Sequence, residues 1–243
     1  MEPTTLAIAA TGLFLAGIIK GATGLGYASC ALPFLVLAIG LKPAMALVLA
    51  PAIATNISLV ISTGHLRWSA EKFHRMYVAM VPGIGAGLMA LLWVDQWVAT
   101  KVLGVVILCY VTLGLARPAF ALAENLHGPL QIPAGFLNGI FTGLTGSQVV
   151  PLLPYVMSLQ LDPDRTVQVI NIGVIVSTAV LSVGLYAAGI LTLQLAGGSL
   201  AAIVPALIGT SIGVRLREAV SVARFRQLVL LTLLAIGLLM ILR

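Results

Sequence analysis

Two short glycine-rich stretches decide how this chain folds: "KGATGLG" at residues 20–26 and "TGLTGSQ" at residues 142–148. Each lies between apolar stretches, and Lys20 is the only charged residue between residues 3 and 41. Glycines at this spacing let the backbone leave helical geometry and let other groups approach it closely. We therefore predict that a helix breaks at each stretch, and we call residues 20–26 the first tip and residues 142–148 the second tip.

The composition is that of a membrane protein. Of the 243 residues, 60% are hydrophobic and 8% are charged, whereas a soluble domain carries about 25% charged residues. Several apolar runs approach the roughly 20 residues that cross a bilayer. The first segment lacks a basic region before it, so we expect it to be retained and not cleaved. The sequence thus predicts an all-α polytopic membrane protein.

The apolar runs divide into ten helical segments, five in each half of the chain. In each half, two short segments flank a glycine-rich tip and three longer segments follow. The predicted segments are Leu6–Lys20, Tyr27–Gly40, Ala44–Ile61, Met76–Val94, Thr100–Ala116, Pro129–Thr142, Val149–Leu159, Thr166–Leu185, Leu195–Val214 and Phe225–Leu242. We expect a first transmembrane repeat at residues 1–117, a linker at 118–128 and a second repeat at 129–243. Whether the short pairs cross the membrane or turn back is left open.

The two halves repeat one sequence pattern. "FLAGIIKGATGLG" from Phe14 aligns without a gap with "FLNGIFTGLTGSQ" from Phe136, and Pro33 then falls against Pro154. A unit of five segments, used twice, enters the membrane from opposite sides. The pattern therefore predicts an inverted repeat.

The basic residues favour the same arrangement. The stretch 63–75 carries Arg67, Lys72 and Arg75, whereas its counterpart 187–195 has no charge. Nine of the thirteen basic residues fall on one predicted side and three on the other, and Lys20 belongs to neither side. Because positive charge is enriched in cytoplasmic loops, we expect both termini on the side of the membrane opposite the cytoplasm.

The two tips, entering from opposite faces, are expected to meet near the midplane. Lipid cannot satisfy the backbone groups freed by a break, so the break must be buried in protein or line a wet cavity. The amides that begin the following helix carry partial positive charge, and together with Lys20 they suit a small oxyanion. The predicted binding residues are Lys20, Gly21, Thr23, Gly24, Gly26, Tyr27, Gly143, Thr145, Gly146, Ser147 and Gln148, with Asn56, Gln168 and Asn171 as secondary candidates.

Plainer roles remain open for these residues. Glycines such as Gly17, Gly21 and Gly139 also form small-xxx-small rows that let helices pack closely. Lys20 is alternatively a residue whose side chain extends to the membrane surface. An isolated asparagine or glutamine inside the membrane often joins one helix to another.

Several classes of function are disfavoured. All seven acidic residues lie in loops or at segment ends, so no intramembrane carboxylate is present to relay protons or bind a cation. No catalytic motif occurs, and the histidines lie in predicted loops. Cys30 and Cys109 lack the spacing of a disulfide or metal pair. We expect no enzyme activity, no metal, no cofactor and no nucleic-acid partner.

The chain resembles the TauE/SafE sulfite exporter family. The resemblance is carried by "GATGLGYASCALPFLVLAIGLKPAMAL" from Gly21 and by its echo "GLTGSQVVPLLPYVMSLQLDPDRTVQ" from Gly143, and it covers nearly the whole chain. It implies a bacterial inner-membrane carrier of sulfite, thiosulfate, sulfonates or related sulfur-containing anions. Many members have a more glycine-rich first tip where this chain has Leu25, Gly26 and Tyr27, so sulfite and an organic sulfonate both stay open as substrates.

On this basis we expect an exporter of small sulfur-containing oxyanions that works by alternating access around a midplane site. Two alternatives remain from other classes of function. One is an anion channel that uses the same site as a filter, and the other is a membrane scaffold subunit without transport. The sequence does not give the oligomeric state or a coupling ion.

Overall fold

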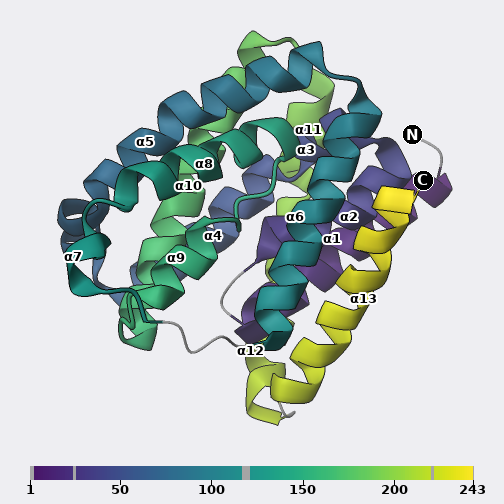
Figure 1. The fold of residues 1–243 in the computed structure, drawn as a ribbon. Helices are drawn as coiled ribbons and strands as arrows, with labels where there is room; N and C mark the ends of the chain where they lie inside the picture. Colours follow the sequence, from purple (N-terminus) through teal and green to yellow (C-terminus); the bar gives the residue numbers. More distant parts are fainter. Residues whose placement is uncertain (1–2, 24–25, 117–120, 220–221, 243) are drawn as a thin grey trace.

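The computed structural model describes residues 3–23, 26–116, 121–219 and 222–242. Within these ranges every regular element is a helix, and five helical stretches are long and apolar enough to cross a membrane. The helices are α1 (Pro3–Thr23), α2 (Tyr27–Ile39), α3 (Leu41–Leu47), α4 (Leu49–Thr63), α5 (Leu66–Trp93), α6 (Gln96–Ala116), α7 (Glu124–His127), α8 (Gln131–Thr145), α9 (Leu152–Ser158), α10 (Pro163–Ala187), α11 (Leu193–Ala201), α12 (Ile203–Ala219) and α13 (Val222–Leu242). The prediction of an all-α polytopic membrane protein is confirmed (Figure 1).

Helix α5 begins ten residues before the predicted start at Met76. Its first turns carry charged residues, including Arg67 and Glu71, which form an ion pair with an Nε–Oε1 distance of 2.8 Å. Ser69, Phe73 and Met76 are buried at the i, i+4 and i+7 spacing of one helix face. The predicted start at Met76 followed hydropathy and was wrong. The first turns of α5 are amphipathic, so their mean hydropathy is low although they are helical.

The short segments around the tips also differ from their predicted lengths. Helix α1 has 21 residues, a length of about 31 Å at 1.5 Å per residue, which is enough to span the membrane core. Helix α9 has only seven residues and begins three residues later than predicted, because residues 146–151 are not helical. Pro151 contributes to this break, since the residue before a proline is disfavoured in helical geometry.

Helices from the two halves pack against each other in reciprocal pairs. The first helix of one half packs against the fourth segment of the other, as α1 with α12 and α8 with α5. A Cβ at Gly17 would lie 3.1 Å from Cα of Gly209, and a Cβ at Gly83 would lie 3.1 Å from Cα of Gly139. Helix α4 packs against α10 and α6 against α13 (Figure 1). An inverted repeat would produce this set of pairs, and the repeat itself stays a prediction.

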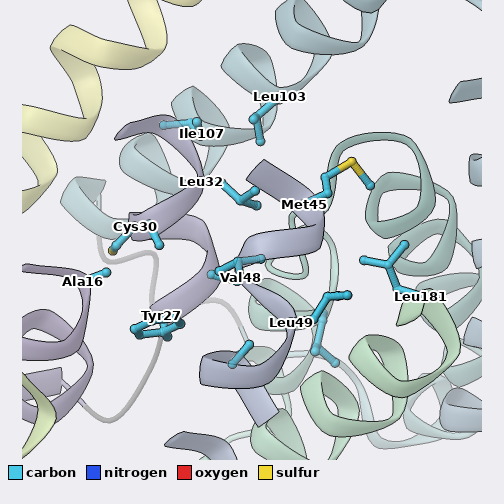
Figure 2. Close-up of a cluster of buried hydrophobic side chains, with 14 of the residues drawn as sticks. Ala16, Tyr27, Cys30, Leu32, Met45, Val48, Leu49, Leu103, Ile107 and Leu181 are labelled. Carbon is cyan, nitrogen blue, oxygen red and sulfur yellow. The ribbon is translucent and has the colours of Figure 1, made fainter. Parts of the chain in front are cut away.

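A buried apolar cluster lies beside the helix that follows the first tip. Tyr27 and Leu32 of α2, Met45 of α3, Leu49 of α4 and Leu103 of α6 belong to this cluster (Figure 2). All five are at most 4% exposed. The start of α2 is therefore fixed by packing on several sides, which gives the first tip a rigid support.

Three helix ends gather on one side of the molecule. The end of α2 at Gly40, the first turns of α6 at Lys101 and the last turn of α13 at Met240 line one cavity of about 360 Å³. Helix α1 begins on this side as well, close to the end of α13 (Figure 1). Lys42 and Lys101, two of the three basic residues predicted on the periplasmic side, lie at or next to these ends, and the third, Arg243, lies outside the described residues. The orientation in the membrane stays a prediction.

Candidate anion site

The side chain of Lys20 lies inside the protein, in the last turn of α1, and is 2% exposed. Its Nζ donates hydrogen bonds to Oδ1 of Asn56 on α4, at 2.7 Å, and to Oδ1 of Asn171 on α10, at 2.6 Å. Lys20 therefore does not extend to the membrane surface. Its ammonium joins the two central helices, which come from opposite halves of the chain.

Both asparagines are held in place by their own helices. Nδ2 of Asn56 donates to the carbonyl oxygen of Ala52 at 2.6 Å, and Nδ2 of Asn171 donates to that of Val167 at 2.7 Å. Since an amide has one oxygen and one nitrogen, these bonds fix which end faces Lys20. The two oxygens are therefore held in positions where both accept hydrogen bonds from one ammonium group.

No carboxylate neutralises Lys20 within the part of the chain that the structure describes. The two ion pairs found there, Arg67–Glu71 and Arg165–Asp162, are at exposed positions on other helices. An ammonium in a membrane protein that is bound only by neutral oxygens has no counter-charge, and burying it in this way is costly.

A cavity of about 30 Å³ lies beside Lys20. The hydroxyl of Tyr27 is buried there without a hydrogen-bond partner among the described residues, and so is Oε1 of Gln148. Other lining residues come from both halves: Gly26, Ala28, Ser29, Asn56, Tyr110, Val149, Leu153, Ile170 and Val174. The cavity thus combines a cation with polar groups that lack partners, which is the composition of a ligand site.

The first tip ends in a backbone conformation that suits glycine. Gly26 has a φ of 82° and precedes α2, whose first internal hydrogen bond runs from the amide of Cys30 to the carbonyl of Gly26 at 3.0 Å. A Cβ at Gly26 would lie 3.4 Å from the hydroxyl of Tyr110. The amides at the start of α2 line the cavity and have no partner within the helix. Gly24 and the side chain of Thr23 lie outside what the structure describes.

The second tip is held by side chains of α8. The hydroxyl of Thr142 donates to the carbonyl of Ser147 at 3.2 Å, and Nδ2 of Asn138 donates to that of Gln148 at 3.1 Å. The hydroxyl of Thr145 donates to the carbonyl of Phe141 at 2.6 Å and accepts from the amide of Ser147 at 3.2 Å. The polar groups of this tip are therefore largely used to hold the non-helical residues that follow.

Of the second-tip residues predicted to bind the anion, the structure brings only Gln148 to the cavity. Its Nε2 donates to the hydroxyl of Thr178 at 2.8 Å, and that hydroxyl donates to the carbonyl of Val174 at 2.7 Å. This chain of donors fixes the amide, so that Oε1 is the end left without a partner. Gly146 and Ser147 are buried nearby but do not line the cavity.

Three other predicted site residues lie elsewhere. Gly21 packs against α12 and Gly143 against α5, where a Cβ would collide with the backbone of the neighbouring helix. Gln168 of α10 contacts Thr63, the last residue of α4. The packing role that the sequence left open for the two glycines agrees with these contacts.

Sequence reasoning missed two polar residues at or next to the cavity. Tyr110 of α6 lines it, and the hydroxyl of Thr178 accepts a hydrogen bond from Gln148. Thr178 had a detectable signal, because it is a polar residue within an apolar span. Tyr110 had none, since its contact with the tip depends on how α6 packs.

The comparisons with known proteins agree with this geometry. The family model described as sulfite exporter TauE/SafE matches residues 8–240, which is nearly the whole chain. No curated protein and no solved structure matches the chain. The family is one of membrane transporters, in keeping with the apolar helices and the buried cationic site. The chain therefore belongs to the sulfite exporter TauE/SafE family.

Proposed function

We propose that the protein is a carrier that exports small sulfur-containing oxyanions, such as sulfite, thiosulfate or organosulfonates. One observation carries this proposal: the Lys20 ammonium is buried next to a cavity and is bound by the neutral oxygens of Asn56 and Asn171. A buried charge without a counter-charge is costly. An anion that enters the cavity supplies the missing charge. Its attraction to the ammonium then offsets part of the cost of burying that charge.

Two features favour a carrier over a channel. Lys20 is 2% exposed, so the protein must open before an anion from solution reaches its ammonium. Lys20 also joins α4 and α10 from opposite halves, so a ligand that competes for its hydrogen bonds acts on both halves at once. We propose that the halves move relative to each other and expose the site to each side in turn.

Transport by purified protein in proteoliposomes tests the proposal. We expect saturable uptake of labelled sulfite, accelerated by unlabelled sulfite on the opposite side, because a carrier returns faster when it is loaded. Flux that does not saturate would indicate the channel, and the absence of flux for every anion would indicate the scaffold. Lys20→Met protein serves as the control that is expected to be folded but inactive.

We also propose that the protein lies in the bacterial inner membrane with both termini in the periplasm. Reporter fusions after Arg75 and Arg117 are expected to read cytoplasmic, and fusions after Asp95 and Ala188 periplasmic. A cytoplasmic reading at the C-terminus would contradict the repeat of five segments.

A further inference from the structure

We propose that the cavity beside Lys20 selects singly charged oxyanions, namely hydrogensulfite and sulfonates, over doubly charged ones such as sulfate and thiosulfate, and this removes thiosulfate from the ligands named above. This inference rests on the proposed function, since it names the charge of the ligand that the same site takes. It is argued from the charges and the hydrogen bonds that surround the cavity.

The first argument is charge balance. Lys20 supplies one positive charge, and the other residues that line the cavity are neutral. The sequence has no other charge from residue 3 to residue 41 and none from 129 to 161, the two stretches that contain the tips. A monoanion thus forms a neutral complex, whereas a dianion leaves one negative charge buried in a medium of low dielectric constant, which is strongly unfavourable.

The second argument concerns the donors around the cavity. The amide nitrogens of Asn56 and Asn171 are already bonded to backbone carbonyls, and their oxygens face Lys20. Each Nδ2 keeps one further N–H, but this is a neutral donor and adds no positive charge to the site. The remaining donors, such as the hydroxyl of Tyr27, are neutral groups and do not balance a second negative charge.

The third argument is the unpartnered oxygen of Gln148. The hydrogen bond from its Nε2 to Thr178 holds the amide in one orientation, and Oε1 is a buried acceptor without a partner among the described residues. This oxygen repels sulfate and methanesulfonate alike, so it favours hydrogensulfite among the singly charged ligands and leaves the comparison of methanesulfonate with sulfate to charge alone. A ligand that carries a hydrogen-bond donor, as the O–H of hydrogensulfite does, satisfies it and removes the cost of burying it alone.

A pair of anions of similar shape tests the charge rule. Methanesulfonate and sulfate are both tetrahedral at sulfur, but the first has one negative charge and the second has two. We expect purified full-length protein in detergent to bind methanesulfonate at least about tenfold more tightly than sulfate, measured by titration calorimetry. Only binding that is lost in Lys20→Met counts as binding at this site.

The pH dependence of sulfite binding provides a second readout. As the pH rises through the pKa of hydrogensulfite, the ligand becomes a dianion, so the apparent affinity for total sulfite should fall. Methanesulfonate does not titrate in this range, and its affinity reports any titration of the protein itself. The ratio of the two affinities should therefore follow the fraction of hydrogensulfite.

The outcomes separate this inference from the proposed function. Equal or tighter binding of sulfate, or a sulfite-to-methanesulfonate ratio that does not change with pH, would overturn the charge rule while leaving an anion carrier. Failure of all three anions to bind in a Lys20-dependent way would refute the proposed function itself.

Discussion

Residues 20–26 and 142–148 share two glycines and a threonine, but they use their polar groups differently. At the first tip, Lys20 donates to asparagines on two other helices. At the second tip, Thr142 stands in the same position and donates to carbonyls of its own segment, those of Asn138 and Ser147. One tip thus contributes a charge to a shared site, and the other holds its own backbone.

The difference shows that packing and chemistry are separable within the repeat. Gly21 and Gly143 occupy equivalent positions, and both are pressed against the backbone of a helix from the other half. The packing is therefore alike in the two halves, while the charge is present in only one. A single small anion needs only one ammonium, so a second lysine at position 142 would add a buried charge without a partner.

The largest effect is expected from Lys20→Met. Anion binding should weaken at least about thirtyfold, since removal of one member of a buried charged pair typically costs about 2–5 kcal/mol. The fold should persist, because the ammonium that is costly to bury is removed as well. Calorimetry and thermal unfolding measure the two effects, and Lys20→Arg should retain part of the affinity. Anion affinity like that of the wild type in Lys20→Met would contradict the site.

A carboxylate introduced next to Lys20 should weaken anion binding almost as much as Lys20→Met does. In Asn171→Asp an internal ion pair replaces the hydrogen bond at 2.6 Å, and the site then no longer needs an external anion. We expect binding to weaken about thirtyfold with little loss of stability. Gln168→Glu on the same helix is the control, because Gln168 lies away from the cavity. If that variant loses as much affinity, the effect comes from buried acid in general.

Much of the fold was predictable from the sequence, because glycine rows, apolar runs and charge asymmetry act through local rules. The start of α5 was not, since Arg67 and Lys72 lower the hydropathy of turns that are nevertheless helical. The non-helical conformation of residues 146–151 was not predictable either. It depends on hydrogen bonds from Asn138 and Thr142 that an alignment of the two halves does not reveal.

The site was predictable in part. Lys20 stood out as a lone charge in an apolar run, and its burial follows the prediction. Asn56 and Asn171 ranked low because nothing in the sequence shows that their oxygens meet one ammonium. That meeting requires α4 and α10 to cross beside the end of α1, which is a property of tertiary packing.

Gly21 and Gly143 test the close helix packing that the two tips share. Gly21→Ala and Gly143→Ala should each lower the stability by about 1–3 kcal/mol, because the new methyl groups meet backbone that has no room to move. Similar losses are expected at both tips, as measured by thermal unfolding. Gly85→Ala on α5 is the matched control, since a Cβ there meets nothing within 4 Å. A large loss at one tip alone would mean that the two helix pairs are not equivalent.

The smallest effect is expected from Thr142→Val, which tests whether the second tip takes part in binding. Valine keeps the shape of threonine but loses the hydroxyl that donates to the carbonyls of Asn138, at 2.8 Å, and Ser147, at 3.2 Å. The carbonyl of Ser147 then loses this donor, so stability should fall by about 1 kcal/mol. Anion affinity should change less than about threefold, because the hydroxyl points to the backbone and away from the ligand. A loss of affinity close to that of Lys20→Met, with stability unchanged, would show that the second tip also binds the anion.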